Sequence, residues 1–172
     1  MGRHILLVGL PGSGKTTVGR LVAERLKAGF VDFDLVITRK MGMPIARVFG
    51  EHGEVKFREM ERKAAESAFS GPPAVIAPGG GWAAQPGQLE AAKASCYTVY
   101  LKVLATTAAQ RASGDGTRPM LAGDDPVARM RDLLKEREPF YLLADAQVKG
   151  DNRTAESVAD EVATIARQQA GW

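Results

Sequence analysis

The stretch GLPGSGKT, residues 9–16, follows the apolar run His4–Val8 and precedes a helical pattern over about 15–28. It matches the P-loop pattern G-x4-G-K-[ST] in the strand-to-helix context that this motif requires. Its glycines let successive backbone N–H groups point into one concavity, and the N-terminus of the following helix adds partial positive charge. The stretch therefore predicts a phosphate-binding loop at the end of a strand.

A P-loop of this kind predicts ATP and Mg²⁺ as ligands. We expect Lys15 to reach the β- and γ-phosphates and Thr16 to place its hydroxyl on Mg²⁺. The ATP-binding residues predicted in the loop are Gly12, Ser13, Gly14, Lys15, Thr16 and Thr17.

Short apolar runs alternate with longer amphipathic segments along the chain, which is typical of an α/β protein. The runs predict strands at about 4–9, 30–33, 73–77, 96–102 and 145–148. The amphipathic segments predict helices at about 15–28, 34–41, 44–50, 52–70, 86–94, 105–113, 125–143 and 154–169. Unbroken apolar strands suit a parallel sheet that is covered by helices on both faces, so we expect a three-layer α/β/α fold.

Length and composition predict one domain over residues 1–172, with 45% apolar and 25% charged residues. The single Cys96 stands in a predicted strand, and we expect an unreactive core thiol. The glycine-bearing polar stretch over about 112–124 predicts a lid. We see no secretion signal or membrane span, and we expect a monomer in the cytoplasm.

The formal net charge of +3 leaves nucleic acid open as a partner, but Lys and Arg are interleaved with Asp and Glu along the helices. Only 6% of the residues are aromatic, and no basic stripe carries stacking side chains. We therefore expect a small anionic ligand rather than nucleic acid.

Two carboxylates, Asp32 and Asp34, end the second apolar run at positions that share one side of an extended chain. Asp32 could reach a water on Mg²⁺, and Asp34 could accept a hydrogen bond from the hydroxyl that attacks ATP. The alternative is that either residue caps the following helix, for which Asp34 in particular is suited.

The segment from Glu54 to Arg62 predicts a charged helix in which Glu54, Arg58 and Glu61 share a face. Periodicity alone favours a solvated stripe with weak intrahelical pairs. A second glycine-rich stretch, APGGGWA at 77–83, follows the third apolar run.

Taken in order, GLPGSGKT, VDFD at 31–34, FGEHGEVKFREMERKA from 49, GGG at 79–81, TRPML at 117–121 and REPFY at 137–141 resemble the shikimate kinase family. The resemblance implies a five-stranded parallel sheet in the order 2-3-1-4-5 and phosphorylation of the 3-hydroxyl of shikimate by MgATP. It also implies that the helices over about 34–70 help to bind the acceptor.

Residue roles follow from the resemblance position by position. Asp34 resembles the residue that binds the acceptor hydroxyls and acts as base or orienter, and Arg58 and Arg137 resemble the pair that holds the carboxylate. Arg118 resembles the lid arginine that closes over the transferred phosphate. The remaining implied residues are Gly79, Gly80 and Gly81 beside the acceptor, and Arg111 and Arg153 beside the nucleotide.

Trp82 departs from the family pattern, which has a small residue after the glycine triplet. A tryptophan buries about 200 Å² and could crowd the acceptor pocket, or its ring could turn outward or pack on a neighbouring helix. Gluconate and other polyhydroxy acids therefore stay open as acceptors. A nucleotide-binding module without an acceptor is the more distant alternative.

Overall fold

The chain forms one five-stranded parallel sheet in the order β2-β3-β1-β4-β5, in a computed structural model that describes residues 2–113 and 125–172. The strands are β1 (His4–Val8), β2 (Gly29–Asp32), β3 (Ala74–Ala77), β4 (Cys96–Lys102) and β5 (Ala146–Lys149). The predicted strand order and parallel pairing are confirmed.

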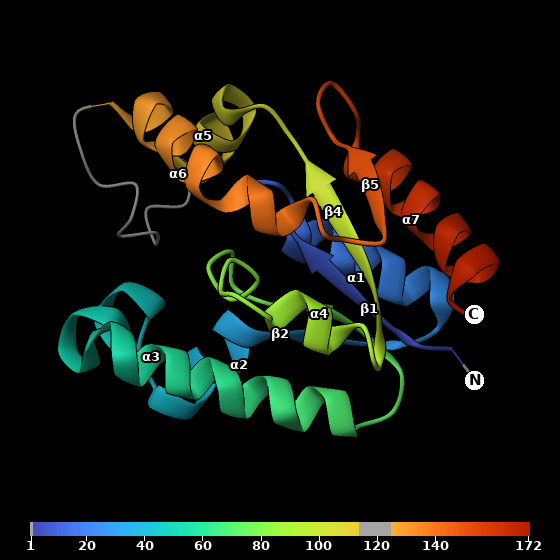
Figure 1. Ribbon diagram of the computed structural model, residues 1–172, viewed down its shortest axis with the longest axis horizontal. Coiled ribbons are helices and arrows are strands. Elements are labelled where there is room, and N and C mark those ends of the chain that lie inside the picture. The colour runs from blue at the N-terminus through green and yellow to red at the C-terminus, as the bar shows by residue number, and fades with distance from the viewer. Residues whose placement is uncertain (1, 114–124) are drawn as a thin grey trace.

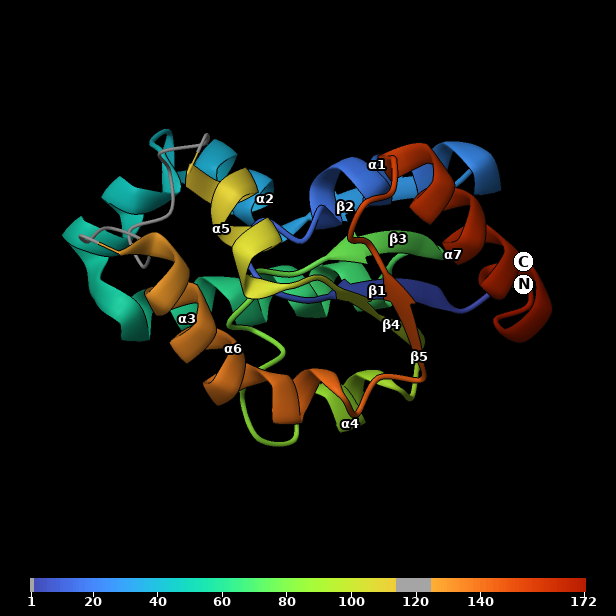
Figure 2. The ribbon, with the colours of Figure 1, turned by 90° about the horizontal axis from the view of Figure 1, so that it is seen from above.

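Helices connect the strands and pack on both faces of the sheet (Figure 1). They are α1 (Lys15–Leu26), α2 (Phe33–Met41), α3 (Ile45–Ser70), α4 (Gln88–Ala92), α5 (Ala105–Ser113), α6 (Pro126–Tyr141) and α7 (Ala155–Gln169). In Figure 2 α1 and α7 lie on one face of the sheet, and α3, α4 and α6 lie on the other. The three-layer prediction is therefore confirmed.

Strand β1 shows why the sheet can be covered on both sides. Ile5 and Leu7 are buried in one apolar cluster with side chains of α1 and α7, whereas Leu6 and Val8 are buried in a second cluster with side chains of α3, α4 and α6. Successive side chains of a strand point to opposite faces, so an unbroken apolar run needs an apolar layer on each side.

Two element boundaries differ from the sequence prediction. β2 ends at Asp32 and α2 begins at Phe33, so Asp34 lies in the first helical turn and not in an extended chain. The expected helices at 44–50 and 52–70 both lie within α3, which is interrupted at Gly53, where φ is 77° and ψ is 170°. These angles are accessible almost only to glycine, which explains why the break falls there.

The carboxyl ends of neighbouring parallel strands meet at one edge of the sheet, where ligands bind in open α/β folds. The P-loop follows β1, Asp32 ends β2, and the second glycine-rich stretch follows β3. Because β3 lies between β1 and β2, the topology brings all three segments together. No helix in the described ranges combines the length and apolar character needed to cross a bilayer.

Candidate active site

The P-loop holds its own lysine in this structure. Gly14 is the N-cap of α1 with φ 97°, and Gly12 has φ 79°, so both glycines adopt left-handed backbone. Lys15 is the first residue of α1, and its buried Nζ donates to the carbonyl oxygens of Gly9 (2.7 Å) and Leu10 (2.8 Å). The ammonium group therefore lies inside the concavity where the sequence predicts phosphate.

Asp32 joins the P-loop helix to α2. One of its carboxylate oxygens accepts a 2.7 Å hydrogen bond from the Thr16 hydroxyl, and the other accepts from the N–H of Leu35 at 3.2 Å. Asp32 therefore caps α2, the role that the sequence suggested mainly for Asp34. The Thr16 hydroxyl and the Asp32 carboxylate form a pair of hard oxygen ligands next to the loop.

A cavity of about 300 Å³ opens beside the P-loop. Arg111 lies in its wall and donates to the carbonyl of Gly150 at 3.3 Å, whereas Arg153 is paired with Glu161 at 2.7 Å. The residues that line this cavity are Ser13, Gly14, Thr17, Val18, Leu101, Arg111, Gly150, Arg153, Ala155 and Val158. Most of the predicted nucleotide-binding residues are thus brought together here.

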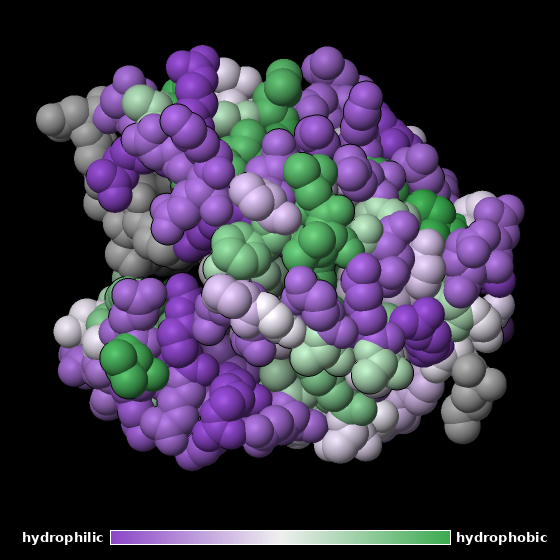
Figure 3. Space-filling view, viewed as in Figure 1, coloured by the Kyte–Doolittle hydropathy of each residue, from purple (hydrophilic) through white to green (hydrophobic). Residues whose placement is uncertain are grey.

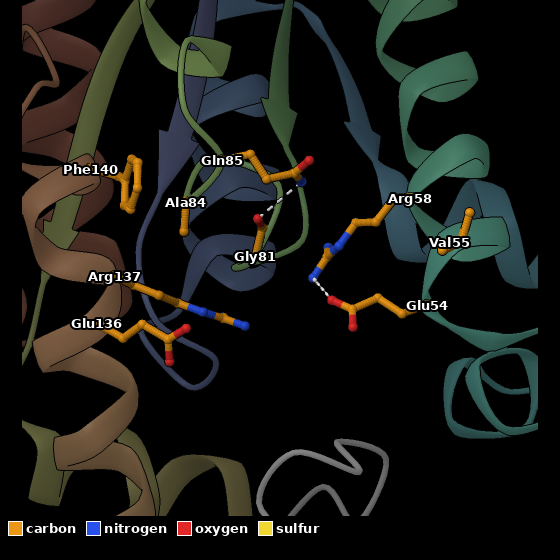
Figure 4. A pocket seen from close by; sticks show the side chains of 9 residues that line it. All are labelled: Glu54, Val55, Arg58, Gly81, Ala84, Gln85, Glu136, Arg137 and Phe140. Atoms are coloured by element: carbon orange, nitrogen blue, oxygen red, sulfur yellow. Dashed lines mark hydrogen bonds and ion pairs between the residues drawn. The ribbon is translucent and has the colours of Figure 1, made fainter.

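A second cavity of about 630 Å³ lies between α3, α6 and the second glycine-rich stretch (Figure 4). Arg58 extends into it from α3 and Arg137 extends into it from α6, so that the two guanidinium groups approach Gly81 from opposite walls. The lining residues are Glu54, Val55, Arg58, Gly81, Ala84, Gln85, Glu136, Arg137 and Phe140. Two converging arginines can hold a small carboxylate by forked hydrogen bonds.

The glycine triplet is required by close approach. A Cβ atom on Gly79 would lie 2.7 Å from Oε2 of Glu61, and one on Gly81 would lie 2.5 Å from Nη2 of Arg58. On Gly80 it would lie 3.0 Å from Nη1 of Arg137 and 3.2 Å from the carbonyl oxygen of Gly9. Any side chain would displace the site residues, and the triplet lies directly against the P-loop.

Asp34 lies beside Gly79, the first residue of the glycine triplet. A Cβ on Gly79 would be 3.5 Å from its Oδ1, and the Asp34 charge also acts on Glu61. The structure therefore brings Asp34, Arg58, Arg137 and the triplet together, as the resemblance implied. Arg118 and most of the expected lid over 112–124 lie outside the described residues.

The comparisons with known proteins show the family of this chain. A family model of shikimate kinase matches residues 11–167. The chain belongs to the shikimate kinase family. The shikimate kinase of Caldanaerobacter subterraneus subsp. tengcongensis is 39% identical over 160 residues, which make up 93% of this chain and 94% of that protein. The shikimate kinase of Mycobacterium avium is 42% identical over 144 residues, which are 84% of this chain and 81% of that protein.

A solved structure of Acinetobacter baumannii shikimate kinase in complex with shikimate is similar to the whole fold. Its TM-score is 0.91 at 36% identity, over 98% of this chain and 94% of that one. The prediction of a shikimate kinase family member, made from the ordered motifs, is confirmed.

Trp82 does not obstruct the second cavity of this chain. Its side chain is buried, and its ring stands edge-on to Phe33 and to Phe69, each with ring centroids 5.9 Å away. Trp82 is absent from the residues that line the cavity. The ring packs against residues of α2 and α3. Of the two expectations for Trp82, packing on a neighbouring helix is therefore the one observed.

Glu61 is the site residue that periodicity missed. It is 0% exposed and pairs with Arg58 at 2.5 Å, whereas the outer side of α3 is hydrophilic and solvated (Figure 3). Burial raises the pKa of Glu61 to about 7, against the lowering effect of Arg58. The solvated-stripe interpretation is therefore wrong for Arg58 and Glu61, because the inner face of α3 packs against the glycine triplet. Glu54, at 67% exposure, fits that interpretation better.

Proposed function

We propose that this protein transfers the γ-phosphate of ATP to the 3-hydroxyl of shikimate, giving shikimate 3-phosphate and ADP. The observation that carries the proposal is the pair of arginines, Arg58 and Arg137, that converge on Gly81 next to a P-loop. When these two arginines hold the carboxylate of shikimate, its ring is directed toward Asp34 and the phosphate-binding loop.

On the nucleotide side, the backbone of Gly12, Ser13 and Gly14 and the N-terminus of α1 bind the phosphates. Lys15 exchanges its two carbonyl partners for the β- and γ-phosphate oxygens when ATP enters. Thr17 and Arg111 contact the nucleotide from the wall of the smaller cavity, and Arg153 contacts it near the base.

Thr16 and Asp32 fit Mg²⁺, with Asp32 acting through a bound water. Mg²⁺ takes oxygen ligands and commonly keeps several waters while it binds one or two protein groups and the substrate phosphates. When bound, Mg²⁺ neutralises charge that develops on the transferred group.

On the acceptor side, Arg58 and Arg137 fix the carboxylate, and Asp34 accepts a hydrogen bond from the attacking hydroxyl. Gly79, Gly80 and Gly81 line the ring. Phosphoryl transfer has a loose transition state, so this positioning supplies much of the catalysis. We also assign Arg118 to the transferred phosphate and the segment 112–124 to a lid that excludes water.

We further propose that one domain over residues 1–172 acts as a monomer in the cytoplasm, with no nucleic acid or membrane as partner.

A coupled ADP-release assay over shikimate, gluconate and quinate tests the acceptor. We expect turnover with shikimate well above the rate without any acid, which measures ATP hydrolysis alone. Turnover with gluconate but not with shikimate would replace the proposed acceptor by another polyhydroxy acid.

A further inference from the structure

Tyr141 ends the helix that carries Arg137. The two residues are four positions apart on α6, so both side chains point to the same face of the helix. Arg137 reaches the acceptor cavity, whereas Tyr141 is fully buried beneath it. Its hydroxyl donates a 2.6 Å hydrogen bond to the carbonyl oxygen of Gly80, across 61 positions of sequence.

Gly80 is the middle residue of a triplet that has no side chains with which to anchor itself. Glycine backbone has more conformational freedom than any other, so a run of three needs contacts from outside to keep one conformation. The carbonyl of Gly80 and the N–H of Gly81 belong to one planar trans peptide unit and point in opposite directions. The Tyr141 hydrogen bond therefore fixes the direction of the Gly81 N–H as well.

The phenol is suited to this task. Burial raises the pKa of Tyr141 to about 12, against the lowering effect of the Arg137 side chain, which is also hydrogen-bonded to this hydroxyl. The hydroxyl therefore keeps its proton over the physiological range and contacts both Arg137 and Gly80. Its ring packs against that of Tyr100 with centroids 5.3 Å apart, which limits the positions available to the hydroxyl. The donor is therefore held by the same core that holds α6.

We propose that Tyr141 is a positioning residue for the acceptor site, which sets the glycine triplet at a fixed distance from Arg137. One helix then places both the cation that binds the carboxylate and the backbone that lines the ring. Loss of the hydroxyl alone lets the triplet drift relative to Arg137 and weakens acceptor binding, while the nucleotide side stays intact. The inference rests on the proposed function.

The competing explanation is that the hydroxyl only satisfies a buried carbonyl and so stabilises the fold. Tyr100 provides a matched control because it belongs to the same buried cluster and also donates a 2.6 Å hydrogen bond, to Oε2 of Glu138. Glu138 does not line the acceptor cavity. Tyr100→Phe therefore removes a part-buried hydroxyl from the same cluster without touching the triplet.

The experiment compares the wild type with Tyr141→Phe and Tyr100→Phe. It measures kcat, the KM for the acid, the KM for ATP, the dissociation constant for the acid without nucleotide, and the melting temperature. We expect Tyr141→Phe to raise the acid KM and dissociation constant about three- to tenfold, the equivalent of one ordinary hydrogen bond, with the KM for ATP changed less than about twofold. Tyr100→Phe is expected to lower the melting temperature with unchanged acid binding.

Equal acid binding by Tyr141→Phe and wild type would overturn the inference, and so would an equal weakening in both variants. Removal of an aromatic ring could unfold the protein, so both variants keep the ring, and the direct binding measurement is made well below the lower melting temperature. The acid is whichever member of the panel the wild type phosphorylates. The effect of Tyr141→Phe on acid binding can therefore be measured even if the acceptor is not shikimate. A wrong acceptor and a wrong role for Tyr141 give different results.

Discussion

The nucleotide and acceptor sides of this site are built in different ways. The P-loop side consists mainly of consecutive residues whose backbone N–H groups and lysine act together at the start of α1. The acceptor side is assembled from side chains of α2, α3 and α6 and from the stretch after β3. A local site is recognisable as a motif, whereas a site assembled from distant segments depends on the whole fold.

The largest effect is expected where the local side is broken. Lys15→Ala should lower turnover by about 10²- to 10³-fold, because it removes the cation aimed at the transferred phosphate. ADP release with shikimate measures the loss. The melting temperature is the control. Lys15→Ala removes two hydrogen bonds to the P-loop carbonyls of Gly9 and Leu10 but leaves the sheet and the helices intact, so we expect the fold to survive. Retained turnover would contradict the role given to Lys15.

Breaking the assembled side should have a smaller and more selective effect. Arg58→Ala is expected to raise the KM for shikimate about 10- to 100-fold, as for a lost hydrogen bond between charged groups, with little change in the KM for ATP. Steady-state kinetics with each substrate varied in turn make the measurement.

Arg62→Ala is the matched control for that variant. Arg62 lies one turn along α3 from Arg58, is 59% exposed, and pairs with Glu66 at 2.7 Å on the outer face. Its removal should leave both KM values near those of the wild type. A normal KM for shikimate in Arg58→Ala would return Arg58 to the class of surface residues.

The pH dependence of stability tests the assembled side in a third way. The pKa of Glu61 is raised from 4.5 to about 7, so between these values the folded protein holds a proton that the unfolded chain has released. Stability is therefore lost as pH rises from 4.5 to 7, by at most about 3 kcal/mol. Glu61→Gln should remove this titration, so that the melting temperature of the wild type relative to the variant falls between pH 5 and pH 8.

The groups that face Glu61 are Arg58 on α3, Asp34 on α2 and Arg137 on α6, and all three remain in Glu61→Gln. The control is Glu66→Gln, because Glu66 is 64% exposed on the same helix. The melting temperature of Glu66→Gln should change with pH in the same way as that of the wild type. If the melting temperature of Glu61→Gln also changes with pH as that of the wild type does, the buried carboxyl does not titrate between pH 5 and pH 8.

Much of the fold could be predicted because five short, unbroken apolar runs are typical of parallel strands that helices cover on both faces. The run from His4 to Val8 needs cover on both faces, and the P-loop fixes the helix after it. The sequence predicts a break between two helices near position 51, and the structure has it at Gly53. Periodicity shows that the helical pattern changes register, but it does not show which residue takes the unusual backbone angles.

The site could be predicted only in part, and the reason is tertiary packing. Arg58 and Glu61 repeat as an ordinary charged stripe along α3, and nothing local shows that the triplet will bury one side of it. The sequence likewise does not decide whether Trp82 fills the cavity or packs away from it. Nor does it predict the hydrogen bond of Tyr141 to Gly80. Each depends on residues distant in sequence that the sheet order brings together.

The crowding around the glycine triplet has a consequence for inhibition. A Cβ atom at any of the three positions would run into Glu61, Arg58 or Arg137. A side chain there would push aside the flexible ends of these residues, on which the proposed carboxylate site depends. We therefore expect any substitution in the triplet that weakens a compound bound to its backbone to weaken acid binding as well.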